Sequence, residues 1–167
     1  MKDSKLLYIL FTLLLLVGCS SIEDVVTETK DTVSKAFDAG SKGINVDKGS
    51  FSFYLPDSME EKKNQDKQEN NIILTEGKQA YILFINPLEK KDSRVVYEST
   101  LADQDYLLNE TFEKDDQFGF VQVLEVDDKS FEVTVGVGGV KLTTVTKKNN
   151  VVKTSEKMMQ IANSVRK

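Results

Sequence analysis

The sequence predicts an α+β fold, an antiparallel sheet of about 5–7 strands covered by a C-terminal helix. The first observation is a change of hydrophobic period near Gly43, from helical spacing before it to alternation after it. The second is a series of alternating segments joined by short turn sequences, which is typical of strands that pair antiparallel. The third is the return of helical spacing in the last residues of the chain.

An amphipathic helix is predicted from Ser20 to about Ala39. A capping box formed by Ser20 with Glu23, or by Ser21 with Asp24, would begin it. One helical face collects the apolar side chains, which are Ile22, Val25, Val26, Val33, Ala36 and Phe37.

Because this stripe is narrow, an isolated helix of this kind would be marginal in water. It needs a surface, which is either the following domain or an envelope protein that binds the stripe from Ile22 to Phe37. The alternative is a fluctuating polar tether that holds the domain off a membrane. Both interpretations remain open at the level of sequence.

The domain is predicted to open with a short strand in which Phe51, Phe53 and Leu55 share one side and which ends at Pro56. Residues 60–71 are all polar or charged and indicate a solvated loop. Residues 72–75 and 80–85 then predict a hairpin around a glycine-containing turn.

Residues 93–112 fit a helix, a strand or both. After them, alternating apolar residues over 118–126 and 131–137 predict a long antiparallel hairpin. Gly138 and Gly139 indicate a tight turn or bulge before a last strand over 140–146. The final helix is predicted over residues 155–165, capped by Thr154 or Ser155.

This order of elements, with an aromatic opening strand that runs into Leu55 and Pro56, resembles the PsbP-like α/β sandwich. The resemblance covers roughly Gly49 to Lys167. It implies a fold that recurs in bacterial lipoproteins and in accessory proteins of photosynthetic and transport assemblies. No functional residue of the family carries over to this chain.

The N-terminus looks like the signal peptide of a bacterial lipoprotein precursor. Two lysines precede an apolar run of 12 residues, Leu6 to Val17, whereas a spanning helix needs about 20. The run ends in Leu16, Val17, Gly18 and Cys19, which resembles a lipobox. Cleavage before Cys19 would leave a cysteine carrying two or three acyl chains such as palmitate, which hold a protein on a bilayer at about 0.8 kcal/mol per buried CH₂.

The predicted organisation is therefore a signal peptide over residues 1–18, a lipidated N-terminus and tether over 19–43, and an extracytoplasmic domain over 44–167. Cleavage changes the net charge from −5 to −6, because it removes two lysines and one aspartate. An acidic chain without a basic cluster argues against nucleic acid as a partner. Once Cys19 is acylated no thiol remains for a disulfide, so a hydrophobic core must stabilise the fold.

The sequence contains few patterns that are typical of catalytic sites. The chain has no histidine, which removes the commonest general base and the usual zinc and copper ligand sets. Ser41 lies in a segment only superficially similar to a nucleophile elbow. Ser164 and Lys167 have the spacing of a Ser-x-x-Lys pair but lack the elements that accompany it in known enzymes.

Acidic pairs are the remaining candidates for acid/base or cation sites. The pair at 103 and 105 begins like a calcium loop, but Leu107 and Leu108 replace a ligand and the required glycine. The pairs at 115–116 and 127–128 fit connectors and turns. Gly136, Gly138 and Gly139 precede a strand, not the helix that a phosphate loop would open. We therefore expect no catalytic, cofactor or metal residues, and lipidation at Cys19 alone.

Two functions follow from these observations. The first is a non-catalytic binding or accessory module, anchored by lipid to the extracytoplasmic face of a bacterial cell membrane. The second is an enzyme that uses carboxylates or a Ser/Lys pair on a cell-wall or peptide substrate. A concave pocket with convergent Asp, Glu, Lys or Ser side chains would favour the enzyme, and a flat apolar patch would favour the binding module.

Overall fold

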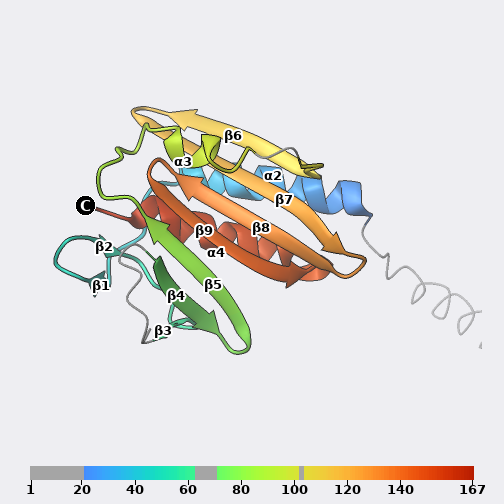
Figure 1. Ribbon diagram of the computed structural model, residues 1–167, viewed down its shortest axis with the longest axis horizontal. Helices are drawn as coiled ribbons and strands as arrows, with labels where there is room; N and C mark the ends of the chain where they lie inside the picture. The colour runs from blue at the N-terminus through green and yellow to red at the C-terminus, as the bar shows by residue number, and fades with distance from the viewer. Residues whose placement is uncertain (1–20, 63–70, 102–103) are drawn as a thin grey trace, which may run out of the picture.

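The computed structural model describes residues 21–62, 71–101 and 104–167. Figure 1 shows the elements in chain order. They are α2 (Ile22–Asp38), β1 (Val46–Asp47), β2 (Ser52–Phe53), β3 (Glu60–Lys62), β4 (Asn71–Glu76), β5 (Gln79–Ile85), α3 (Val95–Glu98), β6 (Leu108–Lys114), β7 (Gln117–Asp127), β8 (Ser130–Val137), β9 (Val140–Lys147), the 3₁₀ helix η1 (Lys148–Asn150) and α4 (Val151–Ser164).

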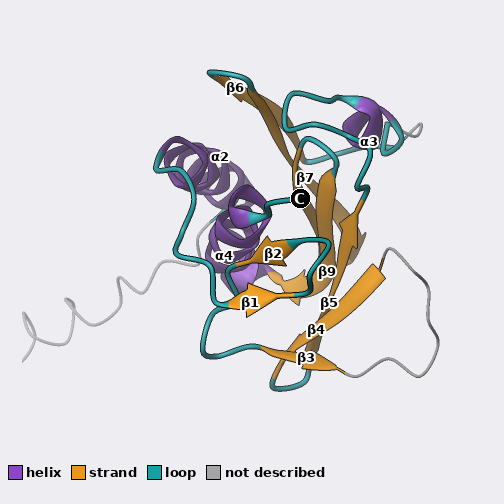
Figure 2. Cartoon of the chain, turned by 90° about the vertical axis from the view of Figure 1, so that its left-hand side faces the viewer, coloured by secondary structure: helices purple, strands orange, loops and turns teal. Residues whose placement is uncertain are grey.

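Seven strands form one antiparallel sheet in the order β3-β4-β5-β9-β8-β7-β6. Helices α2 and α4 pack together against one face, and the short α3 lies on the opposite face (Figure 2). The predicted α+β class, with an antiparallel sheet covered by the C-terminal helix, is confirmed.

The two predicted hairpins form, β4 with β5 and β7 with β8. The β4–β5 turn contains Gly77 at a φ of 58°, and β7 and β8 pair over their length with Val121 opposite Val135. Val121 and Val123 join the core beneath the helices, whereas Phe118 and Phe120 pack on the other face with Val96 of α3. Strand β7 is therefore buried on both faces where α3 covers it.

The helix over the sheet begins earlier than predicted. It starts at Val151 and follows directly from η1, so Thr154 and Ser155 lie inside it and do not cap it. The Ser155 hydroxyl donates to the carbonyl oxygen of Val151 at 2.7 Å. The sequence pattern predicts that a capping side chain begins this helix. In the structure, the 3₁₀ turn η1 begins it instead.

Two other segments differ from the sequence prediction or resolve it. Within the predicted loop over 60–71, Glu60–Lys62 forms an edge strand that pairs with β4. Backbone pairing at an edge does not require apolar alternation, which is why polarity concealed this strand. The ambiguous segment over 93–112 contains both a helix, α3, and the start of a strand, β6.

The predicted opening strand is shorter than expected and lies outside the main sheet. Strand β2 pairs with β1 in a two-stranded ribbon, and Ser52 also forms a backbone bridge with Arg166. Phe53 is fully buried and anchors the ribbon to the core. This ribbon holds the C-terminal residues that follow α4.

Helix α2 begins with the second of the two predicted capping boxes. The Ser21 hydroxyl accepts a hydrogen bond from the Asp24 amide at 3.1 Å, and the Asp24 carboxylate accepts one from the Ser21 amide at 3.0 Å. The buried side of the helix contains Val33 and Phe37, which belong to the same core as α4 and the sheet. The stripe therefore rests on the domain.

Candidate functional site

The lipobox residues Leu16, Val17, Gly18 and Cys19 lie outside the described residues, so the lipidation site stays a prediction. Both serines that are candidate nucleophiles lie within the described residues. Ser41 is exposed after α2, and its hydroxyl donates to the Lys42 carbonyl oxygen at 3.1 Å.

Ser164 and Lys167 do not form a pair. The Ser164 hydroxyl is buried, donates to the Ile161 carbonyl oxygen at 2.6 Å and accepts from the Tyr54 amide at 2.8 Å. The Lys167 ammonium donates to backbone carbonyl oxygens of Asn86 and Glu89. Each group has its own structural partners, and the Ser164 hydroxyl and the Lys167 ammonium do not hydrogen-bond to each other.

Two of the three acidic pairs occupy turns. Asp115 and Asp116 form the β6–β7 turn, with Asp115 at a φ of 51°. The Asp127 carboxylate accepts a hydrogen bond from the Lys129 amide at 2.9 Å in the β7–β8 turn. Asp105 is exposed, and Asp103 lies outside the described residues. Among the residues that the structure describes, no three acidic or cysteine side chains are grouped to hold a metal ion.

The stripe predicted as a surface for an envelope partner is largely buried within the domain. Val33 is 0% and Phe37 3% exposed, and Ile22 and Val26 are partly buried against the core. A partner of the folded domain would therefore meet the polar outer side of α2. A partner for the stripe itself would require this helix to leave the sheet.

A cavity of about 520 Å³ lies at one end of the sheet, a size typical of small-ligand sites. Three segments form it: the loop between β5 and α3, the β8–β9 turn and the residues after α4. Its apolar lining consists of Val137, Val140, Ala162 and Val165, with Pro87 and Leu88 as additional apolar residues on the loop. Its cationic lining consists of Lys90, Lys91, Arg166 and Lys167.

The glycine pair of the β8–β9 turn allows the cavity walls to approach closely. Gly138 has a φ of 53°, and a Cβ atom there would lie 2.3 Å from the Lys90 carbonyl oxygen. A Cβ on Gly139 would lie 2.5 Å from the Cβ of Glu89. The glycine-rich stretch thus serves a tight turn, as its sequence predicts, and it also brings the basic loop against the turn.

The cations in the cavity bind backbone oxygens. The Lys91 ammonium donates to the Asn163 carbonyl oxygen at 3.0 Å, and the Lys167 ammonium donates to the Glu89 carbonyl oxygen at 2.6 Å. None of the side-chain ion pairs among the described residues includes Lys91, Arg166 or Lys167. The side chain of Glu89, the one acidic residue of the lining, accepts a hydrogen bond from Ser93.

Partial burial lowers the pKa of Lys91, and the nearby positive charge of Arg166 lowers it further. Burial also lowers the pKa of Lys167, against an opposing effect of Glu89, while the charge of Lys91 adds to the lowering. The charge of Arg166 thus disfavours the charged form of Lys91, and the charge of Lys91 disfavours that of Lys167, where both lysines are partly desolvated. An anion bound among them would relieve this repulsion.

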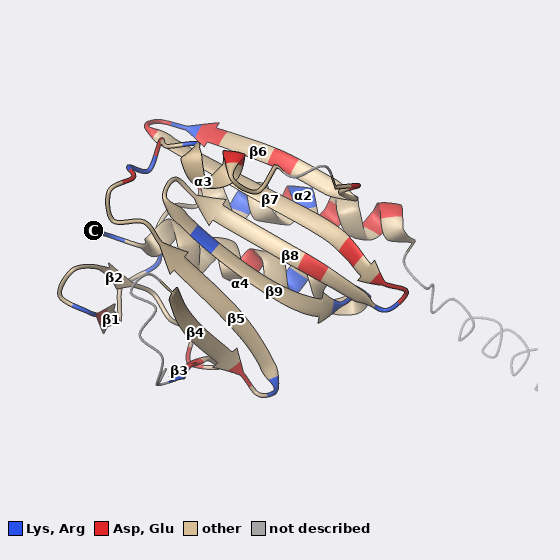
Figure 3. Ribbon diagram, in the orientation of Figure 1, with Lys and Arg blue, Asp and Glu red and all other residues tan. Residues whose placement is uncertain are grey.

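The sequence did not reveal this cavity. Lys90 and Lys91 on one loop and Arg166 and Lys167 after the last helix are only two short basic pairs, far apart in the chain. The net charge of the chain is −5, and only folding brings four cationic side chains and one acidic side chain into the lining of one cavity. Figure 3 marks the positions of the basic and acidic residues along the ribbon.

No family model matches the chain, and no curated protein matches it by sequence. Among solved structures, the chain is similar to the solution structure of the cyanobacterial PsbP protein CyanoP from Synechocystis sp. PCC 6803. The identity is 10%, the alignment covers 74% of this chain and 91% of that chain, and the TM-score is 0.47. At this distance the similarity carries no information about ligand or partner.

The helices in the described parts of the chain are all too short or too polar to span a membrane.

Proposed function

We propose that this protein is a lipoprotein of the bacterial cell envelope, anchored at the extracytoplasmic face of the membrane through acylated Cys19, and that its domain is a non-catalytic binding or accessory module. The anchor rests on the sequence Leu16-Val17-Gly18-Cys19 after a short apolar run. Two or three acyl chains would make this attachment durable without a spanning helix.

The binding role rests on one observation, the cavity at the end of the sheet. It combines an apolar floor with cations that have no carboxylate partner in an ion pair among the described residues. A small number of polar groups beside an apolar surface is the usual composition of a ligand site. The candidate nucleophiles Ser41 and Ser164 lie outside its lining.

The anchor is tested with labelled fatty acid in cells that express the full precursor. The native protein should incorporate label, and Cys19→Ala should not. A matched control combines Cys19→Ala with Ser41→Cys, which restores one thiol outside the lipobox and should remain unlabelled. Label on the Cys19→Ala protein would refute the anchor.

The alternative is an enzyme, and two features favour it. The cavity is concave and lined by convergent Lys and Glu side chains, which is the arrangement expected of an enzyme in the sequence analysis. Lys91, a lysine of this lining with a lowered pKa, is a candidate base or nucleophile. Against it, the Lys91 ammonium donates to the backbone at Asn163. The experiment is an assay for turnover of cell-wall and peptide substrates by the mature chain. Turnover that is lost in Lys91→Met but retained in Lys129→Met would establish the enzyme and overturn the binding module.

A further inference from the structure

We propose that the cavity between the β5–α3 loop, the β8–β9 turn and the C-terminal residues binds a small anionic amphiphile, with its acidic head at Lys91, Arg166 and Lys167 and its apolar portion along Leu88 and the valines of the floor. The proposal rests on the binding function proposed above and names the class of ligand. The head chemistry is that of a carboxylate or a phosphate ester, which Lys and Arg recognise through charge-assisted hydrogen bonds.

The charge of the site favours an anion. Four cationic side chains and one acidic side chain line the cavity of a protein whose net charge is −5. Lys91 and Lys167 use part of their donor capacity on carbonyl oxygens, and an ammonium group has three donors. Partial burial and a neighbouring cation lower the pKa of each lysine, with Glu89 opposing this effect at Lys167. A bound anion would therefore favour the charged form of both lysines.

The shape and apolar lining favour a ligand larger than an inorganic ion. The cavity volume is about 520 Å³, and its floor is formed by Val137, Val140, Ala162 and Val165. Leu88, on the loop that lines the cavity, is 89% exposed, although it is a large apolar side chain. An apolar portion that covered Leu88 would remove this side chain from water, at about 25 cal/mol per Å². The floor residues are only 1–3% exposed, so they would contribute contact with the ligand and little additional buried area.

The cavity walls are held in place before any ligand binds. The Asn86 amide donates to the Gly139 carbonyl oxygen at 2.8 Å, and the Phe118 amide donates to the Lys91 carbonyl oxygen at 2.9 Å. The Gly138 amide in turn donates to the Phe118 carbonyl oxygen at 2.8 Å. These bonds join the loop, the turn and β7, so little ordering cost opposes binding.

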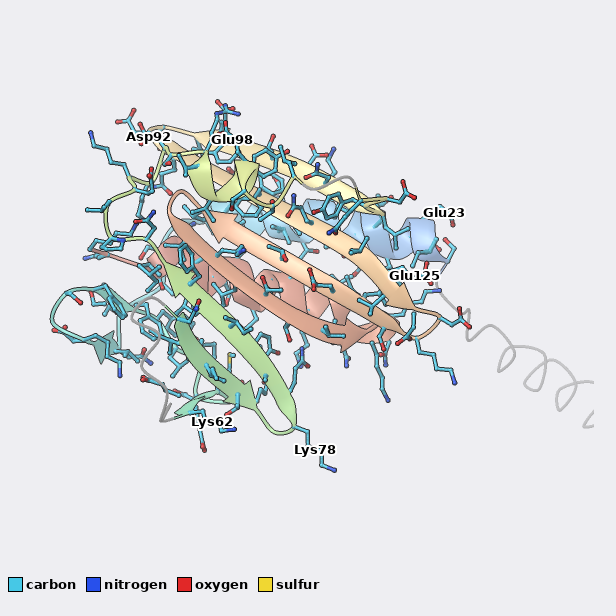
Figure 4. The ribbon with its side chains drawn as sticks, in the orientation of Figure 1. Glu23, Lys62, Lys78, Asp92, Glu98 and Glu125 are labelled. Atoms are coloured by element: carbon cyan, nitrogen blue, oxygen red, sulfur yellow. The ribbon has the colours of Figure 1, made fainter. Side chains whose placement is uncertain are left out.

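The position of the cavity favours a free amphiphile over a lipid in the anchoring membrane. Cys19 is two residues from the helix cap Ser21, a reach of about 7 Å at most. Figure 4 shows Glu23, near the start of α2, and Glu125 together at one end of the molecule. It shows Asp92, in the loop between β5 and α3, at the other end. The eight residues of β8 between these ends span about 25 Å.

The experiment is calorimetric titration of the mature chain, residues 19–167 with Cys19→Ser, which retains every described residue. The probes are decanoate, acetate and decyltrimethylammonium, which separate the head from the tail. We expect saturable 1:1 binding of decanoate, at least tenfold weaker binding of acetate, and no saturation with the cationic amphiphile. Equal binding of the anionic and cationic amphiphiles, or no binding of decanoate, would overturn the proposal.

Three variants locate the site. Arg166→Gln together with Lys167→Gln should weaken decanoate binding at least tenfold, and Leu88→Ser should weaken it severalfold without affecting acetate. Lys129→Gln removes one positive charge in the distant β7–β8 turn and should leave affinity unchanged. Because Lys167 also binds two carbonyl oxygens, Arg166→Gln alone provides a second measurement that leaves those bonds in place. Unchanged affinity in both Arg166 variants would refute the site.

Vesicles distinguish the two sources of the anionic head. The same chain should show no difference in sedimentation between vesicles of phosphatidylcholine and vesicles that also contain phosphatidylglycerol. Sedimentation with the anionic vesicles that is lost in the Arg166→Gln, Lys167→Gln variant would overturn the assignment to a free ligand. Failure of decanoate binding, with Cys19 still acylated in cells, would reject this ligand class and leave the anchored lipoprotein standing.

Discussion

Gly138 shows at the scale of one residue how the turn and the basic loop depend on each other. Its φ of 53° and the close approach of the Lys90 backbone both oppose substitution, since a Cβ would lie 2.3 Å from that carbonyl oxygen. We expect Gly138→Ala to lower the free energy of unfolding by about 2–4 kcal/mol, of which about 1–2 kcal/mol is the cost of the left-handed backbone. Urea denaturation measures this loss.

Gly77→Ala is the matched control, because Gly77 has a φ of 58° and open space around its Cβ position. It should cost only the backbone contribution. Equal losses in the two variants would show that the loop moves away without resistance, which would contradict the preformed cavity.

Glu76 connects the sheet to α4 and gives the protein an acid-sensitive contact. Its carboxylate binds the Lys157 ammonium and accepts a hydrogen bond from the Tyr81 hydroxyl at 3.2 Å. The Lys157 hydrogen bond is the main reason why the pKa of Glu76 lies below its ordinary value of 4.5. A lowered carboxyl pKa stabilises the fold above the unfolded value, and this stability is lost as the pH falls below about 4.5.

We therefore expect Glu76→Gln to lower stability at pH 7 by about 1 kcal/mol, because the group is partly exposed to solvent. The variant should also show a smaller loss of stability between pH 5 and pH 3, measured by urea denaturation at each pH. Glu125→Gln removes the same charge from an exposed position on β7 and serves as the control. An unchanged acid dependence in Glu76→Gln would contradict the assigned role.

At the scale of an element, α4 closes the core. Ile161 is 0% exposed and lies with Met158 and Ala162 in the main cluster beneath the sheet. We expect Ile161→Ala to cost about 2–5 kcal/mol of unfolding free energy, because the lost methyl groups leave a cavity. Val145→Ala on the open face of β9, where the side chain is 51% exposed, should cost less than about 1 kcal/mol. Similar losses in both would refute the helix-on-sheet packing.

Helix α2 lies before the predicted domain boundary at residue 43 but packs on the domain after it. The Phe37 ring lies 5.9 Å from that of Phe112, and the Asn163 amide donates to the Phe37 carbonyl oxygen at 2.9 Å. A fragment that begins at Ile44 loses these contacts and uncovers one side of α4. We expect its midpoint of thermal unfolding to fall well below that of residues 21–167. Equal midpoints would show that residues 44–167 fold independently, as the sequence alone predicts.

At the scale of the whole molecule, the proposed anchor orients the domain. Figure 1 shows the start of α2 and the β7–β8 turn at the same end of the molecule. The acylated cysteine would hold this end near the bilayer and the cavity, which includes the β8–β9 turn, away from it. With Cys19 acylated, a fluorophore on Lys129→Cys or on Leu88→Cys is attached to the one free thiol. Spin-labelled lipids should quench the label at position 129 more strongly. Stronger quenching at position 88 would reverse the orientation and bring the cavity to the membrane.

Local patterns determined which elements form. Alternation over β7, β8 and β9, glycines in their turns and the helical spacing at both ends are properties of neighbouring residues, so the α+β class could be predicted from them. Polar Glu60–Lys62 escaped prediction because an edge strand is selected by its partner, and η1 moved the start of α4 to Val151. The lipobox proposed at Cys19 likewise rests only on adjacent residues.

Tertiary structure alone decided where the candidate site lies. Strand β5 pairs with β9, and this non-local pairing brings the loop carrying Lys91 beside the C-terminal Arg166 and Lys167. It also decided that the stripe of α2 rests on the sheet and α4, where burial of Val33 and Phe37 outweighs the weak preference of an isolated helix. These contacts depend on which distant parts of the chain pack together and exclude water. The sequence shows which surfaces are apolar or charged, but it does not show which of them come into contact.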